Sequence, residues 1–432
     1  MRLTSRLDFG RFTQLLGSYI ASGGALLTSS VAMLLTFGLL ARHMGHEQFA
    51  LNATITALTN VGVQICGLGS QESLVRRVAQ KPSFYPEMLG HVHILNLASG
   101  LVLVLIGMIA IPLALPISDN LTVTLTSTAL ILVTNIVLLK IIWLATNSYI
   151  AHSDFATANK IEILFAALRM LAAVLGCMVF NVTTVAEWAV WNFAAHAVAA
   201  GVAIAAISRL GKPKFLIVRD EIRIGIMFAS QFFFKAVRGN ADILVLSAVV
   251  GSEVLSSYSI ARRLMEASYM SVEAFNRILY PGSAAVALKG MSHVFTRAKR
   301  MAMVTICIGI TSACIVWLIT PLLPLLFGKD YTSLEWLNRS LCWAVIPIAF
   351  GATALEALGA SGLQSIRAKI TNISSIVGAG LVALATWQAG IIGAMTGIYA
   401  IEITIAILAW RALLRARSVE PSAEPSRCTA GN

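Results

Sequence analysis

Residues 94–115 read ILNLASGLVLVLIGMIAIPLAL, a run of 22 residues that contains no charged side chain. An α-helix rises 1.5 Å per residue, so a run of this length crosses the roughly 30 Å hydrocarbon core of a bilayer. Runs of the same kind recur along the chain and are separated by short polar turns. The pattern predicts a bundle of membrane-spanning helices.

Twelve apolar segments can be marked on the sequence, and they predict an all-α polytopic membrane protein. Twelve spans of about 21 residues occupy about 250 residues, which agrees with a hydrophobic content of 57% in 432 residues. The first six segments cover residues 14–41, 49–71, 88–113, 121–148, 160–180 and 184–208. The second six cover residues 224–250, 254–286, 298–320, 336–360, 368–388 and 391–412.

The composition excludes several classes of protein. Charged residues make up 12% of the chain against about 25% in soluble domains, and the mean hydropathy is +0.80. These values exclude a cytosolic enzyme, a nucleic-acid-binding protein and a secreted disulfide scaffold. The cysteines form no CxxC motif, and the pairs His43/His46 and His91/His93 lie near span ends without a cluster of carboxylates or thiols, so we expect neither a disulfide nor a metal. There is no GxxxxGK[ST] motif, so we expect no ATPase activity. We expect no cofactor, and H⁺ or Na⁺ is the candidate coupling ion.

The lysines and arginines are distributed unevenly between the two sides that the segments define. With the N-terminus in the cytoplasm, 22 of them fall in cytoplasmic segments, and three (Arg42, Lys329 and Arg339) fall on the opposite side. An excess of cations in cytoplasmic loops is the usual topology signal of helical membrane proteins. We therefore expect a multi-pass protein with both termini in the cytoplasm.

The two halves of the chain resemble each other at one turn. The first segment is followed by GHEQF (residues 45–49) and the seventh by GSEVL (residues 251–255). Six spans per half is an even number, so the halves share one orientation, as in the parallel repeats of many transporters. We expect an N-terminal lobe over residues 1–210, a C-terminal lobe over residues 211–412 and a disordered cytoplasmic tail over residues 413–432.

Charged side chains lie inside several of the predicted spans. Each costs about 2.5–3.5 kcal/mol at the centre of a lipid-facing helix, and twelve of them would exceed a protein's net stability of about 5–15 kcal/mol. We therefore expect them to face one another or a water-filled interior. The cations are Lys140, Arg169, Lys235, Arg238, Arg262, Arg263 and Arg277, and the acids are Asp242, Glu266, Glu273, Glu356 and Glu402, with Glu162 near an interface.

The spacing of these charges favours one polar face on each of two helices. A repeat of three or four residues places side chains on the same side of a helix. The seventh segment carries Gln231, Lys235, Arg238 and Asp242, and the eighth carries Arg262, Glu266, Tyr269, Glu273 and Arg277. The pattern predicts a central cavity lined mainly by the second half. Two interpretations stay open: structural ion pairs, or cations that receive a phosphate, to which guanidinium is well suited.

Several motifs resemble those of a known family. The motifs are NADILVL (residues 240–246), VVGSEV (249–254), YSIARRL (258–264), LLARHMG (39–45), Pro281 and FGKDY (327–331). In this order they resemble the polysaccharide-transport flippases of the multidrug/oligosaccharidyl-lipid/polysaccharide exporter superfamily. The resemblance covers nearly the whole chain.

The resemblance implies two six-helix lobes around a central cavity, and a secondary transporter rather than an enzyme. It implies movement of an undecaprenyl-diphosphate-linked oligosaccharide between the leaflets of a bacterial inner membrane, with membrane lipids, a polysaccharide polymerase and a chain-length regulator as partners. Basic residues of the family's cavity contact the pyrophosphate, and the matching positions are Lys235, Arg238, Arg262 and Arg263. The resemblance to lipid II flippases is weaker, because that group has fourteen helices and several arginines in the first two. Here no charge lies between Arg11 and Arg42. A flippase of O-antigen or exopolysaccharide repeat units fits better.

Two other functions remain as alternatives. A drug or metabolite antiporter of the same superfamily requires an acidic cavity for cations, whereas the predicted interior has more cations than acids. An integral glycan polymerase or glycosyltransferase requires catalytic groups on sizeable external loops. The longest predicted external loop, residues 321–335, has only 15 residues. Asp242, Glu266, Glu273, Glu356 and Glu402 are the candidate residues for binding a coupling ion.

Overall fold

The structure is a computed structural model that describes residues 9–115, 117–287 and 290–419. Within these ranges the side chains of residues 9–23, 25–27, 277–285 and 419 lie outside the description. The first half contains α1 (Phe9–Ile65), η1 (Cys66–Gly69), α2 (Ser70–Gln80), η2 (Pro82–Phe84), α3 (Tyr85–Ala114), α4 (Leu121–Leu132), η3 (Val133–Leu138), α5 (Leu139–Ala151), α6 (Phe155–Val174), η4 (Leu175–Val179) and α7 (Val185–Leu210). The second half contains α8 (Arg219–Val249), α9 (Ser252–Ala287), α10 (Met291–Ile319), η5 (Thr320–Leu322), α11 (Leu323–Phe327), α12 (Leu334–Leu341), η6 (Cys342–Ala344), α13 (Val345–Ala360) and α14 (Gln364–Val419).

The helices expose many large apolar side chains on their outer surface, as membrane proteins do. On α3, five exposed apolar side chains follow one another at intervals of four residues and so form one outward stripe: Leu97, Leu101, Leu105, Ile109 and Leu113. A stripe of this kind faces lipid, because a soluble surface would expose it to water. In the described part of the chain, eight helical stretches are long and apolar enough to cross a membrane. The chain is therefore an all-α, multi-pass membrane protein.

Two of these eight stretches are each broken in the middle. Within α1, Gly45 has φ 70° and ψ 178°, and within α14, Gly390 has φ 55° and ψ −130°. Both φ values lie in the region that glycine adopts without strain. The helix is therefore kinked at both positions, close to residues 41 and 388, where the first and eleventh predicted segments end.

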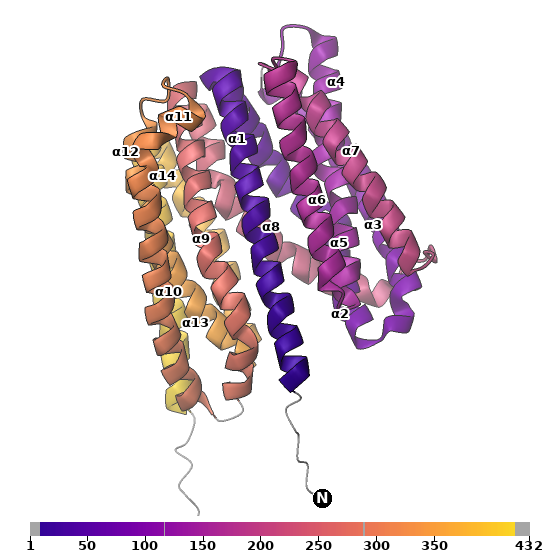
Figure 1. Cartoon of the computed structure of the whole chain (residues 1–432), viewed down its shortest axis with the longest axis vertical. Helices are drawn as coiled ribbons and strands as arrows, with labels where there is room; N and C mark the ends of the chain where they lie inside the picture. The colour runs from indigo at the N-terminus through magenta and orange to yellow at the C-terminus, as the bar shows by residue number, and fades with distance from the viewer. Residues whose placement is uncertain (1–8, 116, 288–289, 420–432) are drawn as a thin grey trace, which may run out of the picture.

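The helices form two groups with α1 between them (Figure 1). Helices α3–α7 make up one group and α9–α14 the other. The main contacts between the two halves of the chain pair α1, η1 or α2 with α8, α9 or α11. The helices that carry the two similar turns therefore form the contact between the halves: the two parts of α1 on either side of Gly45, α8 and α9.

One end of the bundle, which we call the Gly45 end, joins the halves through polar contacts. His46 Nδ1 lies 3.1 Å from Ser256 Oγ, so the two similar turns meet. Tyr331 donates its hydroxyl to the Ala41 carbonyl at 2.6 Å, and Arg42 donates to the Leu325 carbonyl at 3.1 Å. These contacts hold the start of α9 and the α11–α12 region against α1.

The opposite end, which we call the Lys212 end, contains the connector at residues 211–218. Glu221, at the start of α8, accepts a hydrogen bond from Arg76 at 2.9 Å, and Arg77 lies 3.8 Å away. The Lys214 amide donates to the Pro86 carbonyl at 2.8 Å. The connector and the first turn of α8 are therefore fixed to α2 and α3 of the first half.

The C-terminal end of α14 differs from the expected boundary. The sequence analysis placed residues 413–432 in a disordered tail, whereas α14 continues to Val419. Leu413 is fully buried against the second half, and the alanine, leucine and arginine residues of this stretch favour helix. Residues 420–432 lie outside the described ranges.

Candidate functional site

A cavity of about 270 Å³ lies among α1, η3, α5, α6, α7 and α9. Arg169 of α6 and Arg263 of α9 both line it. Among the described residues that line the cavity, none is acidic. Its other polar and aromatic lining residues are Thr36, Asn52, Thr56, Asn60, Asn135, Asn192, His196, Phe37, Trp143, Phe165 and Trp188.

A second cavity of about 160 Å³ adjoins the first, between α1, α8 and α9. Arg263, Phe37, Thr56 and Asn60 line both spaces, so the two are neighbours across one wall. Arg262 and Glu266 also line the second cavity. A cationic region therefore extends from the first half to the contact between the halves.

Arg169 lies in the interior without a carboxylate partner among the described residues. It forms no ion pair with any described carboxylate, and its Nε atom is buried without a hydrogen-bond partner. Its guanidinium lies 5.8 Å from the centre of the Phe165 ring. Arg263 lies 5.6 Å from the centre of the Phe37 ring and pairs with Glu266 at 3.1 Å. A desolvated guanidinium without an acid attracts an anion strongly, because the surrounding dielectric is low.

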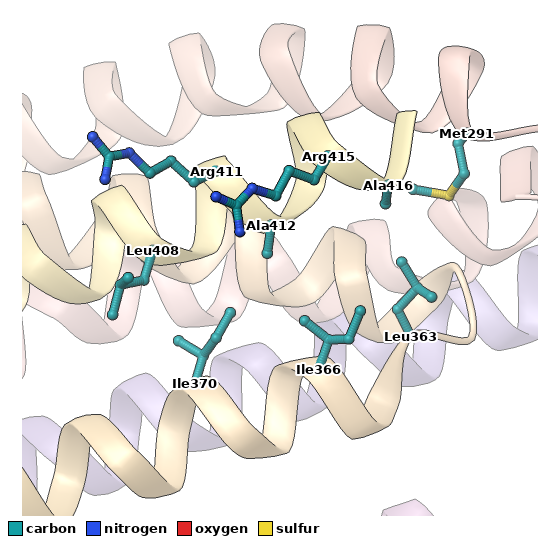
Figure 2. Close-up of a pocket in the computed structure, with 9 residues that line it drawn as sticks. All are labelled: Met291, Leu363, Ile366, Ile370, Leu408, Arg411, Ala412, Arg415 and Ala416. Atoms are coloured by element: carbon teal, nitrogen blue, oxygen red, sulfur yellow. The ribbon is translucent and has the colours of Figure 1, made fainter. Parts of the chain in front are cut away.

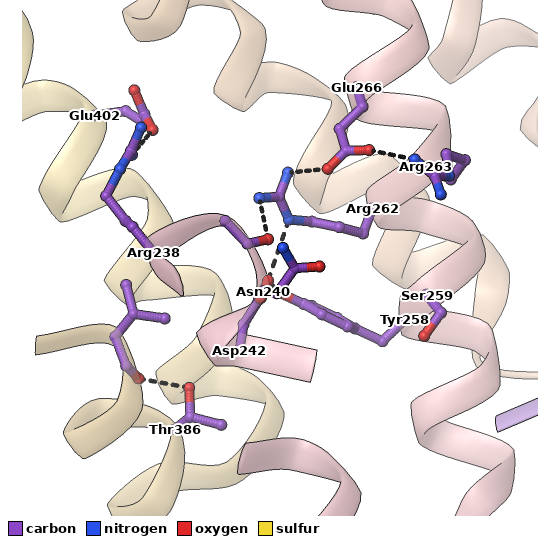
Figure 3. A network of polar contacts seen from close by, with 12 residues as sticks. Arg238, Asn240, Asp242, Tyr258, Ser259, Arg262, Arg263, Glu266, Thr386 and Glu402 are labelled. Carbon is purple, nitrogen blue, oxygen red and sulfur yellow. Dashed lines mark hydrogen bonds and ion pairs between the residues drawn. The ribbon is translucent and has the colours of Figure 1, made fainter. Parts of the chain in front are cut away.

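Behind this region, a buried carboxylate joins α8 to α9 (Figure 3). Asp242 is 1% exposed and accepts hydrogen bonds from Tyr258 Oη at 2.6 Å and Arg262 Nε at 3.1 Å. Arg262 also lies 3.3 Å from Glu266, one turn further along α9. Both hydrogen bonds reach Oδ2 of Asp242, whereas its Oδ1 is buried without a partner among the described residues.

Arg238 has its ion-pair partner on another helix and not on its own. Arg238 Nη1 pairs with Glu402 of α14, and not with Asp242 one turn further along α8 (Figure 3). The polar stripe of the seventh segment is thus divided between two ion pairs. Arg238 lines neither of the two cavities above.

The other predicted charges lie at separate places. Lys140 is buried in α5, with its ammonium 5.4 Å from the Trp143 ring centre, and Lys235 is exposed on α8. Glu356 pairs with Arg367 at 2.8 Å. Glu273 is half-buried in α9. The side chain of Arg277 lies outside the described residues.

The prediction that the second half mainly lines the cavity was wrong. Helices α1, α5, α6 and α7 supply most of the lining, and α9 supplies Arg263. The reason is that uncharged polar side chains also line the interior, and the positions of charged residues alone do not reveal them. A usable signal was present: Asn52, Thr56 and Asn60 are spaced by four residues and so share one helical face.

A π-helical segment orients one of these amides. Segment η3 interrupts the run from α4 to α5, and it contains Asn135. Asn135 Nδ2 donates to Thr59 Oγ1 at 3.1 Å, which ties η3 to the second part of α1. Single π turns of this kind often occur at functional sites. They cannot be predicted from the periodicity of the sequence.

The fold is similar to that of solved transporters. An inward-facing multidrug resistance MATE family transporter of the MOP superfamily superimposes with a TM-score of 0.72 at 14% identity, covering 93% of this chain and 100% of that chain. The MATE multidrug transporter DinF-BH gives 0.69 at 16% identity, with 96% and 98% covered. The Vibrio cholerae MATE transporter VcmN in the bent form gives 0.66 at 12% identity, with 94% and 98% covered.

No family model and no curated protein sequence matches this chain. The likeness to solved structures therefore establishes the fold, which is that of MATE transporters of the MOP superfamily. The multidrug/oligosaccharidyl-lipid/polysaccharide exporter superfamily of the sequence analysis is the same superfamily. The solved structures therefore confirm the expected fold, but not the particular family.

Proposed function

We propose that this protein flips an undecaprenyl-diphosphate-linked oligosaccharide from the cytoplasmic to the periplasmic leaflet of a bacterial inner membrane. The observation that carries the proposal is the cavity that contains Arg169 and Arg263 and no carboxylate among its described lining residues. A diphosphate is a compact anion, and guanidinium groups hold phosphate oxygens with paired hydrogen bonds. A site for cationic drugs requires the opposite charge.

The uncharged lining supports a sugar as the rest of the substrate. Amide side chains both donate and accept hydrogen bonds, so the four asparagines of the cavity match hydroxyl groups of either orientation. The cavity and its neighbour, about 270 and 160 Å³, are too small for a whole oligosaccharide. Loading therefore requires the halves to part, which rocking of two repeats provides.

The proposal includes twelve spans in two six-helix lobes, with residues 1–210 and 211–412 as the lobes. The two broken stretches supply two spans each, and α8 and α9 complete the set although their charges exclude them from the apolar stretches. The Lys212 end then faces the cytoplasm. The contacts of His46 and Tyr331 close the periplasmic end.

Replacing Arg169 tests the proposal. The variant Arg169→Ala is expressed in cells that lack the native gene, and surface glycan, lipid-linked oligosaccharide and membrane abundance of the protein are measured. We expect surface glycan to fall at least tenfold and the lipid-linked precursor to accumulate. Abundance should stay normal, because no described carboxylate loses its partner. Arg169→Lys should keep part of the activity, since it retains the charge but loses the planar fork.

The control is Arg300→Ala, which removes an exposed arginine of α10; glycan export should not change. Full export by Arg169→Ala at normal abundance would refute the role of Arg169. If deletion of the gene leaves surface glycan intact but abolishes efflux of cationic dyes, the protein is a drug antiporter and the proposal is wrong.

A further inference from the structure

A second candidate site, bordered by two arginines and lined by aliphatic side chains, lies at the Lys212 end of the second half. It is separate from the candidate substrate cavity. A groove of about 620 Å³ runs between the first turns of α14 and its last turns (Figure 2). It shares no lining residue with either cavity near Arg263. Its apolar walls include Leu363, Ile366, Ile370 and Leu408.

Two arginines border this groove. Arg411 and Arg415 are one helical turn apart on α14, so both side chains lie along the same face (Figure 2). Both residues are exposed, and neither guanidinium forms a hydrogen bond or ion pair with another described residue. Leu413 is buried on the other side of the helix, so packing fixes this orientation.

The position of the groove matches the boundary between lipid tails and headgroups. Arg415 is four residues from the end of α14 at Val419, and Leu363 lies in the turn just before α14 begins. The apolar walls extend from this boundary toward the membrane interior, since Ile370 and Leu408 are further from the ends of the helix than Leu363 and Arg415. A ligand of this groove must carry an anion at one end and a hydrocarbon at the other.

We propose that the groove binds an anionic phospholipid of the leaflet at the Lys212 end. The phosphate lies between Arg411 and Arg415, and one acyl chain lies along Ile366, Ile370 and Leu408. Basic pockets between transmembrane helices bind acidic headgroups in this way, and each cation near the surface contributes about 1 kcal/mol. The site is independent of the transported substrate, so it stands whether or not the proposed function does.

The experiment measures lipid binding to the purified full-length protein in a neutral detergent. Phosphatidylglycerol is titrated while Tm is followed, and bound lipids are counted by native mass spectrometry; phosphatidylcholine serves as the zwitterionic lipid. We expect phosphatidylglycerol to raise Tm more than phosphatidylcholine does. The variant R411Q/R415Q should bind it roughly 30-fold more weakly, from about fivefold per cation.

The matched control is K299Q/R300Q, which removes two exposed cations from α10 at the same end of the bundle. It should bind phosphatidylglycerol like the unaltered protein. A416W fills the groove without removing charge and should also lose binding, which keeps the test valid if R411Q/R415Q fails to fold. Equal binding by R411Q/R415Q and the control, or equal stabilisation by both lipids, overturns the proposal.

Discussion

Arg238 and Glu402 have little solvent around them, with side chains 16% and 14% exposed. Removing one member of such a pair leaves the other charge uncompensated, which costs about 3–5 kcal/mol. We expect Arg238→Ala and Glu402→Ala each to lower membrane abundance and Tm. The double variant R238A/E402A should recover much of both, because no lone charge remains. Thermal unfolding of the purified variants measures the effect.

The same variants decide between the two interpretations of Arg238 in the sequence analysis. If the residue only pairs with Glu402, the exchange R238E/E402R should restore glycan export together with stability. If Arg238→Ala is as abundant and stable as the unaltered protein but exports no glycan, the pair is not structural. Arg238 would then contact the substrate.

At the scale of single elements, α8 packs unusually close to η1. A Cβ atom on Gly225 would lie 2.5 Å from the Leu68 carbonyl oxygen, which belongs to the backbone and cannot rotate away. We expect Gly225→Val to force α8 from η1 and to destabilise the protein by about 1–3 kcal/mol or more. Gly239→Val on the same helix meets nothing within 4 Å and is the control. Equal Tm values for the two variants would contradict the packing.

The membrane-spanning segments and turns could be predicted from the sequence, but the side-chain contacts between helices could not. The span at 88–113 is part of α3, and the break near Gly45 falls where a GHEQF turn was marked, because length and composition determine spans and turns. Glu402 is 164 residues from Arg238, and no periodicity relates positions on separate helices. The π-helical η3 depends on packing around Asn135. The spacing of charged residues therefore identified α8 and α9 as polar helices. It did not identify the helices that supply most of the cavity lining.

At the scale of the whole molecule, the proposed orientation can be tested directly. Reporter fusions near Ser83, Lys212, Gly290 and Glu420 should report a cytoplasmic position, and fusions near His46, Asn181 and Asp330 a periplasmic one. The positive-inside rule and the even number of spans per half give this result. A periplasmic Lys212 would contradict the twelve-span arrangement.

The contact at the Gly45 end predicts a conformational lock. His46 and Ser256 touch through their side chains, so cysteines at both positions should form a disulfide when oxidised. In a background without native cysteines, oxidised H46C/S256C should stop glycan export, and a reductant should restore it. The single variants are the controls. Export at full rate by the completely oxidised protein would show that this end does not open during transport.

Helices α8 and α9 also bear on how the chain enters the membrane. Insertion machinery releases a helix into lipid according to its own hydropathy, and neither helix is among the eight apolar stretches. Glu221 of α8 is held by Arg76 and Arg77 of α2, residues that emerge from the ribosome much earlier. α8 therefore has a polar partner in the first half before Glu402, its partner in α14, has been synthesised.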